Sequence, residues 1–294
     1  MYREMTPADH RRVLGIDEEQ VPDVLLLLGV FDSHAGAERF AGYLEDAVPL
    51  RRYPGYLGSY KGLRVGLAAG MGGPLAAFHA HTWIQAGVPT VVQLGWYGAL
   101  EPGTGIGDVV VPRHSERQDG VSDWYLPKGI LADATPDLSE AIAAQLREQG
   151  VGVHERGIYS TPALLAESRE IIVDWSRHGY HGVDMETAAT FAVAKSMGVR
   201  RAAALIRFDD LVAEEDHMAE KLPRERFEIL RGREPIVVSS VLDALLAERE
   251  AMTERVLGGR ELSGARGAGL VLVDMRGFDQ AGNIGLGTGA AKRM

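Results

Sequence analysis

The chain has 294 residues, which is long enough for one large α/β domain or two small ones. Hydrophobic residues make up 46% of it, and the formal net charge of −10 disfavours a nucleic-acid partner or an anionic membrane surface. The chain contains no cysteine, which excludes disulfides, thiolate catalysis and cysteine-ligated metal centres.

Residues 1–22 form a polar segment of mixed charge. This segment lacks the apolar centre of a secretory signal. No window of the sequence approaches the roughly 18 apolar residues that a membrane helix requires. We therefore expect a cytoplasmic protein without a membrane partner.

Short apolar runs, mostly bounded by glycine or proline, alternate with helical patterns along the chain. The runs predicted as strands are 24–31, 63–69, 88–94, 109–111 and 202–208. The ranges predicted as helices are 35–44, 75–86, 138–149, 167–177, 186–197 and 227–248. Nearly continuous apolarity over so few residues is typical of strands buried on both faces, and the alternation predicts a single α/β sandwich.

We assign residues 23–250 to this α/β domain and residues 251–294 to a glycine-rich C-terminal extension. An apolar patch at residues 270–273 predicts one edge strand within the extension. The remainder, from residue 256 onward, is typical of a flexible or irregular tail.

Glycine-rich turns follow three strand ends, at Gly29, at residues 70–73 and at residues 95–98. In open α/β sheets, ligands bind at the carboxyl ends of the strands. Glycine at such a position lets the backbone approach a ligand closely. A single turn of this kind is most simply explained as a turn that binds no ligand, whereas three in succession predict a ligand site.

Several common catalytic motifs are missing, including phosphate-binding loops, the dinucleotide-binding glycine pattern and the serine nucleophile elbow. His79 and His81 are two residues apart on a predicted helix, so their side chains project to different faces. This spacing is poor for a shared metal ion. We expect neither a metal nor an organic cofactor, although phosphate remains a possible co-substrate.

A series of segments carries a family resemblance. In chain order they are VLLLLG at 24–29, GYLGSYKG at 55–62, GMGGP at 70–74, QLGWYGAL at 93–100, GDVVV at 107–111, DGVS at 119–122 with YLP at 125–127, GVDMETAA at 182–189, and FDDL at 208–211. Together they resemble the nucleoside phosphorylase family, which includes purine nucleoside and uridine phosphorylases and related nucleosidases. The segment at 182–189 is the most specific of them.

The resemblance implies a three-layer α/β/α sandwich with a mixed, partly barrel-like central sheet. It also implies self-association as a homodimer or a homohexamer, in which a neighbour completes each site. Arg51 and Tyr60 are the candidates to cross that interface.

Glu186 stands at the junction of a predicted short strand and a helix. A single carboxylate can accept hydrogen bonds from both vicinal hydroxyls of a ribose, which would fix the sugar. The resemblance implies this role for Glu186, with Met185 against the sugar and Met71 as a further ribose contact. The alternative is a glutamate that only stabilises the start of a helix.

Asp209 ends an apolar strand, where partial desolvation raises the pKa of a carboxyl group. A protonated acid there can donate to the leaving base as the glycosidic bond breaks. The resemblance favours Asp209 as this acid, and it places a partner arginine, Arg224 or Arg226, in the following loop. Alternatively, the Asp209 carboxylate only caps the segment that follows, and Asp210 could fill that role equally well.

The chain departs from the family at the phosphate site. Ser33 and Gln93 stand where the family has arginines, and Trp96 stands where it has a hydroxyl residue, whereas Arg51 survives. Because a phosphate dianion needs several cationic donors, phosphorolysis by the usual route is impaired. The residues assigned to this former phosphate or nucleophile pocket are Gly29, Asp32, Ser33, His34, Arg51, Gln93, Gly95 and Trp96.

Three functions remain open: hydrolysis with Asp32 or His34 orienting the water, a modified phosphorolysis, and nucleoside binding without turnover. The nature of the base is also open, because residues 160–165 are aliphatic where purine-specific relatives carry aromatic residues. Trp96 or Tyr97 is a candidate stacking surface, although core packing is expected for at least one of them. The residues assigned to the base pocket are Tyr97, Gly98, Leu164, Val183 and Asp184.

Overall fold

The structure is a computed structural model that describes residues 2–213 and 223–263, the last twelve of these by their backbone alone. The chain divides into two units, Met1–Glu250 and Ala251–Met294. The edge strand predicted at residues 270–273 lies outside the described residues.

The first unit is built on a mixed sheet of twelve strands. In chain order they are β1 (Val24–Gly29), β2 (Glu45–Pro49), β3 (Gly55–Tyr60), β4 (Leu63–Ala69), β5 (Thr90–Ala99), β6 (Val109–Val110), β7 (His114–Arg117), β8 (Ala132–Asp133), β9 (Val153–His154), β10 (Gly157–Ser160), β11 (Gly182–Asp184) and β12 (Arg200–Asp210). Strand β5 is the hub of the sheet, because it pairs in parallel with β1 and β12 and in antiparallel with β11. This mixed sheet confirms the expected fold class.

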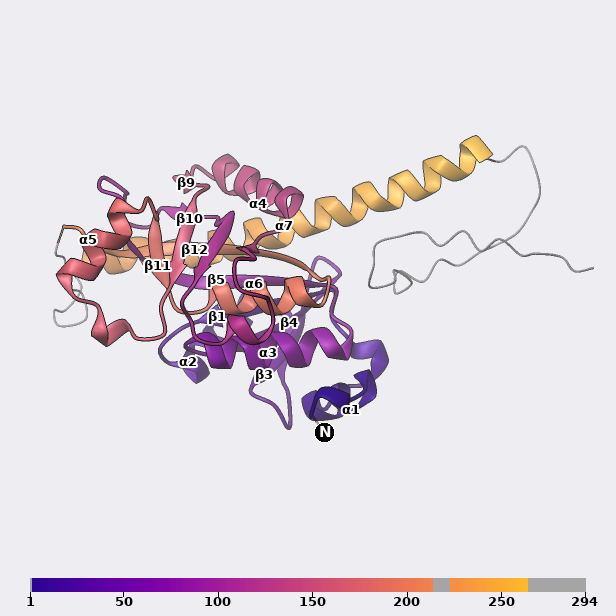
Figure 1. Ribbon diagram of the computed structural model, residues 1–294. Coiled ribbons are helices and arrows are strands. Elements are labelled where there is room, and N and C mark those ends of the chain that lie inside the picture. Colours follow the sequence, from indigo (N-terminus) through magenta and orange to yellow (C-terminus); the bar gives the residue numbers. More distant parts are fainter. Residues whose placement is uncertain (1, 214–222, 264–294) are drawn as a thin grey trace, which may run out of the picture. The chain divides into compact units, whose positions relative to one another are not determined.

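Seven α-helices are present in the described residues. They are α1 (Pro7–Leu14), α2 (Ser33–Ala41), α3 (Gly73–Ala86), α4 (Pro136–Glu148), α5 (Arg169–Arg177), α6 (Thr187–Ser196) and α7 (Arg224–Ser263). One large apolar cluster joins the sheet to α2, α4 and α7, and a second joins it to α1, α3 and α6. In Figure 1, α4 lies on one side of the sheet and α3 and α6 lie on the other. The two clusters therefore make the three layers.

The structure adds a helix at the N-terminal end and corrects one expectation at the C-terminal end. Part of the polar segment 1–22 forms α1, which Thr6 and Asp9 cap reciprocally, and its Leu14 is buried in the cluster around α3. At the other end, α7 continues to Ser263, so residues 256–263 are helical rather than irregular. Proline is missing from residues 249–263, and most of them are compatible with a helix.

A small core lies where the sheet curls. Tyr97, Ala99, Val110, Ile158 and Leu205 form a separate buried cluster contributed by β5, β6, β10 and β12. These strands include β12, which pairs with both β5 and β6. The curl brings the last residues of β5 close to those of β12.

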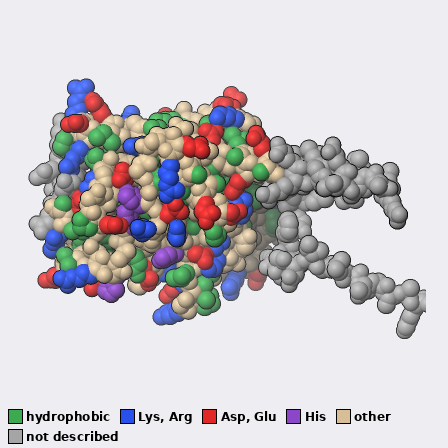
Figure 2. Space-filling view, turned by 90° about the horizontal axis from the view of Figure 1, so that it is seen from above, with side chains coloured by type: hydrophobic (Ala, Val, Ile, Leu, Met, Phe, Trp, Pro, Cys, Tyr) green, Lys and Arg blue, Asp and Glu red, His purple; other side chains and the backbone are tan. Residues whose placement is uncertain are grey.

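The surface is mixed in charge. Figure 2 shows acidic and basic side chains interspersed over one face, without a broad area of either sign. In the part of the chain that the structure describes, no helix has both the length and the apolarity needed to span a membrane.

Candidate functional site

Glu186 lies over the end of β1, where that strand is paired with the middle of β5. Gly29 ends β1 and is aligned with Gly95 of β5. A Cβ atom added to Gly29 would lie 2.5 Å from Oε2 of Glu186, and one added to Gly95 would lie 2.9 Å from the Gly29 carbonyl oxygen. Both positions therefore need glycine, because any side chain would displace the carboxylate or separate the strands.

The Glu186 carboxylate is also held from the start of α3. The Gly72 amide donates a hydrogen bond of 2.5 Å to Oε1 of Glu186, whose side chain is buried. Gly72 is the N-cap of α3, where unsatisfied amides and the helix dipole favour a negative charge. Burial and the charge of Asp184 nevertheless raise the pKa of Glu186, while the Gly72 hydrogen bond opposes this shift.

Asp184 anchors the segment that presents Glu186. It is buried, and it accepts hydrogen bonds from the Ser160 hydroxyl at 2.5 Å and from the Thr187 amide at 2.9 Å. The Ser160 oxygen in turn accepts from the Ala188 amide at 3.0 Å. Asp184 therefore fixes the start of α6, and its assignment to the base pocket stays a prediction.

Gln93 lies beside Glu186 on β5. Its Nε2 is 3.3 Å from the position of an added Gly29 Cβ, and its Oε1 accepts a hydrogen bond of 2.7 Å from the Thr190 hydroxyl of α6. Nε2 also donates to the Leu94 carbonyl oxygen at 3.1 Å. Both the oxygen and the nitrogen of the Gln93 side-chain amide are therefore hydrogen-bonded within the protein.

The other residues of the former phosphate pocket lie on α2 and near α1. Asp32 is the N-cap of α2, where its Oδ1 accepts from the Ala35 amide at 3.0 Å. Ser33 and His34 begin that helix, and His34 is exposed. Arg51 lines a separate cleft of about 500 Å³ together with residues of α1. Glu186 is not among the residues that line this cleft.

The two aromatic residues of β5 have different neighbours. Trp96 is half-buried and packs edge-to-face on Phe208, with 6.0 Å between the ring centroids. Tyr97 is buried in the small core, where its hydroxyl lies 3.2 Å from Nε2 of His181. Tyr97 takes the core-packing role that was expected of at least one of the two aromatic residues, and its assignment to the base pocket stays a prediction.

Asp209 and Asp210 are neighbours at the end of β12 and have different surroundings. Oδ1 of Asp209 lies 2.9 Å from the position of an added Gly98 Cβ, next to an irregularity in the β5–β12 pairing. Asp210 accepts from the Val212 and Ala213 amides at 3.1 and 3.0 Å. The capping role that the sequence left open for either residue therefore belongs to Asp210.

The remaining residues predicted for the site have apolar side chains. Met185 is half-buried beside Glu186, and Met71 is 38% exposed in the turn before α3. Val183 is buried against Leu100 and Ile172. Leu164 is half-buried in a short 3₁₀ turn.

Glu167 is a site residue that the sequence did not reveal. It follows the turn Leu164–Ala166, and its Oε1 is buried without a hydrogen-bond partner among the described residues. Burial and the charge of Asp209 raise the pKa of Glu167 to about 7. From the sequence Glu167 is only the first residue of a predicted helix, and nothing in its local pattern indicates burial.

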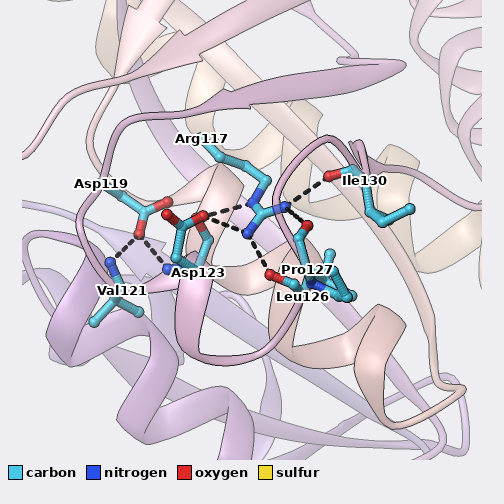
Figure 3. A network of polar contacts seen from close by, with 8 residues as sticks. Arg117, Asp119, Val121, Asp123, Leu126, Pro127 and Ile130 are labelled. Atoms are coloured by element: carbon cyan, nitrogen blue, oxygen red, sulfur yellow. Dashed lines mark hydrogen bonds and ion pairs between the residues drawn. The ribbon is translucent and has the colours of Figure 1, made fainter.

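A clamp centred on Arg117 supports the opening of α3 (Figure 3). The Arg117 guanidinium donates to carbonyl oxygens of Leu126 at 2.7 Å, Pro127 at 2.8 Å and Ile130 at 2.7 Å, and it pairs with Asp123 at 2.6 Å. The same loop carries Asp119, which accepts from the Val121 and Ser122 amides at 2.6 and 2.7 Å.

Asp119 connects this loop to the site. Its Cβ lies 3.0 Å from the position of an added Cβ on Gly73, the first residue of α3. The Arg117 clamp therefore fixes the loop against the same turn that donates to Glu186. As for metal ligands, the described residues contain no cluster of three or more acidic or histidine side chains suited to a cation.

The structure thus has a buried carboxylate over the paired glycines Gly29 and Gly95 and a second acid near the end of β12, on a mixed α/β sheet. The chain belongs to the phosphorylase superfamily, whose family model matches residues 30–243. This confirms the resemblance seen in the sequence.

Known relatives include purine nucleoside phosphorylases. The chain is 27% identical over 201 residues to the DeoD-type purine nucleoside phosphorylase of Roseobacter denitrificans, covering 67% of this chain and 86% of the relative. It is 28% identical over 207 residues to the guanosine phosphorylase of Halorubrum lacusprofundi, covering 68% of this chain and 83% of the relative.

A solved structure shows the same fold. The crystal structure of uridine phosphorylase from Vibrio fischeri matches with a TM-score of 0.71 and 22% sequence identity. The match covers 83% of this chain and 99% of that chain.

Proposed function

We propose that the chain binds a nucleoside and cleaves its N-glycosidic bond, releasing the free base. The observation that carries this proposal is the buried Glu186 carboxylate over Gly29. The Gly72 amide fixes one carboxylate oxygen, so the group is oriented before a sugar arrives. In its ionised form it accepts hydrogen bonds from both ribose hydroxyls.

Asp209 supplies the acid at the other end of the substrate. Its carboxyl group lies over Gly98 of β5, and Glu186 lies over Gly29 of β1, which is paired with Gly95 of β5. As the glycosidic bond breaks, its electron pair moves to the base and Asp209 protonates the base. Glu186 holds the sugar while positive charge develops on it.

The replaced phosphate ligands favour water as the acceptor. Ser33 and Gln93 bring no positive charge, and Gln93 is already bonded to Thr190 and Leu94. A phosphate dianion would be poorly neutralised there. Since the two relatives described above are named for purine nucleosides and guanosine, we propose purine nucleosides as the substrate class.

The test is base release from a panel of purine and pyrimidine nucleosides by the full chain, with and without inorganic phosphate. We expect release from purine nucleosides without phosphate, yielding free ribose. Glu186→Gln and Asp209→Asn should each lower kcat/KM by about 100-fold or more. Binding of nucleosides without any release would contradict the proposal and indicate a binding protein instead.

A further inference from the structure

Two polar side chains meet at the space that Gly29 leaves open. Oε2 of Glu186 and Nε2 of Gln93 lie 2.5 and 3.3 Å from the position of an added Gly29 Cβ. Because both distances start from one point, the two atoms are less than about 6 Å apart, which is the span of two hydrogen bonds that share a central oxygen. The described residues show no direct hydrogen bond between these two side chains.

The Gln93 amide is held in one orientation. The Thr190 hydroxyl, which is buried in α6, donates to its Oε1 at 2.7 Å, and Nε2 donates to the Leu94 carbonyl oxygen at 3.1 Å. If the amide were turned over, its oxygen would face the Leu94 carbonyl oxygen, which repels it. Thr190 and Leu94 therefore keep the nitrogen of Gln93 on the side of Glu186.

This nitrogen has a hydrogen to spare. An amide nitrogen carries two hydrogens, and the described residues accept only the one that Leu94 takes. Gln93 and Glu186 are 1% and 6% exposed, and an unused donor at so buried a position is costly. The Gly72 amide already donates to Oε1 of Glu186. One N–H donor and one carboxylate acceptor, Oε2, thus remain around the same space.

We propose that Gln93 is a specificity-determining residue, and that its spare amide hydrogen and the Glu186 carboxylate hold one hydroxyl oxygen between them. Thr190 is the positioning residue that aims the amide. The proposal rests on the glycosidic cleavage proposed above. A hydroxyl group fits this place because it accepts from Gln93 and donates to ionised Glu186 at the same time. Both the sugar of the nucleoside and the attacking water carry such a group.

The same pair discriminates against phosphate as the acceptor. An oxygen of a phosphate dianion can accept from Gln93, but it has no hydrogen to donate to Glu186. The negative charges of the phosphate and the carboxylate also repel each other, and the neutral Gln93 amide cannot offset this repulsion. The two groups therefore select a neutral hydroxyl over an anion.

The experiment removes the Thr190 hydroxyl and leaves Gln93 and Glu186 in place. Thr190→Val keeps the shape of the side chain but frees the amide to turn. The wild type and the variant are compared on a purine ribonucleoside and on its 2′-deoxy and 3′-deoxy forms, without phosphate.

The result shows which hydroxyl is held. If it belongs to the sugar, Thr190→Val should lose about tenfold in kcat/KM on the ribonucleoside and much less on the form that lacks that hydroxyl. If it belongs to the attacking water, kcat should fall about tenfold on all three substrates while KM stays the same.

Two further variants serve as controls. Thr190→Ser keeps a hydroxyl at this position and should restore the wild-type pattern. Thr82→Val removes another buried helical hydroxyl, which donates to the Phe78 carbonyl oxygen of its own helix at 2.7 Å. It should leave the pattern unchanged, and thermal denaturation should show that all three variants are folded. Wild-type kinetics in Thr190→Val, or no recovery in Thr190→Ser, would overturn the proposal.

A binding measurement separates this proposal from the proposed function. Calorimetry of the same three nucleosides does not need turnover. A wild type that releases no base, but whose affinity for the ribonucleoside falls about tenfold in Thr190→Val and returns in Thr190→Ser, would refute cleavage and keep the Gln93 contact. Base release by a wild type that Thr190→Val matches in both kinetics and affinity would keep the function and refute the contact.

Discussion

Gly29 is the residue on which the geometry of the site depends most directly. Its missing side chain leaves the space that Oε2 of Glu186 occupies, because an added Cβ would approach that atom to 2.5 Å. Real Cβ atoms do not make such contacts, so either the carboxylate or the end of β1 must move. The Gly72 amide holds the other oxygen, which limits how far the group can rotate.

Gly29→Ala should therefore abolish tight nucleoside binding while leaving most of the fold intact. We expect KM to rise by about 100-fold, or binding in calorimetry to be lost, since a misplaced carboxylate misses the sugar hydroxyls. Gly232→Ala is the matched control, because that helical glycine has nothing within 4 Å of an added Cβ. The control should bind normally and gain up to about 1 kcal/mol in stability. Normal binding by Gly29→Ala would remove Glu186 from the site.

At the scale of elements, the loop between β7 and β8 is organised by one side chain. Arg117 is almost completely buried, with 8% of its side chain exposed, and its planar guanidinium reaches three carbonyl oxygens at once. A lysine side chain has a single nitrogen and cannot donate to all three carbonyl oxygens in this arrangement. The loop rests on the first turn of α3, so its order affects the donor to Glu186.

Arg117→Lys should lower the free energy of unfolding by about 2 kcal/mol, because two or more carbonyl oxygens of the loop lose a charged donor that is itself buried. Thermal denaturation gives this value, and limited proteolysis should show faster cleavage within residues 118–131. Arg113→Lys is the control, since the side chain of Arg113 is 69% exposed and should give almost no change. Equal stability of the two variants would show that the clamp is dispensable.

At the scale of the whole molecule, the position of Arg51 bears on assembly. This residue lines the cleft beside α1, together with Arg11, Arg12 and Arg52. We proposed from the family resemblance that it completes the site of a neighbouring subunit. In a symmetric dimer, each subunit would then lend Arg51 to its partner.

Mixed oligomers test this arrangement. Arg51→Ala and Glu186→Gln should each be inactive alone, but co-expressed chains should regain about a quarter of the wild-type activity, because half of the dimers are mixed and one site in each is intact. Sedimentation should show the dimer in all three samples. A monomeric wild type, or no recovery in the mixture, would contradict a shared site.

Much of the fold and half of the site followed from local sequence. The apolar runs at 24–29 and 63–69 became the parallel strands β1 and β4, because strands buried on both faces must be apolar throughout. Gly29 and Glu186 were both assigned to the site before the structure placed them together. Short runs, such as β7 to β10, were missed because two to four residues carry no period.

What the sequence determined, then, was the order of buried strands, the glycine-lined edge and the acid that stands over it, because each leaves a local pattern. Tertiary structure decided which polar groups face one another. Tyr97 and Asp184 point into the protein, to His181 and to Ser160. These neighbours are distant in the chain, and only the curl of the sheet and the packing of its loops bring them into contact.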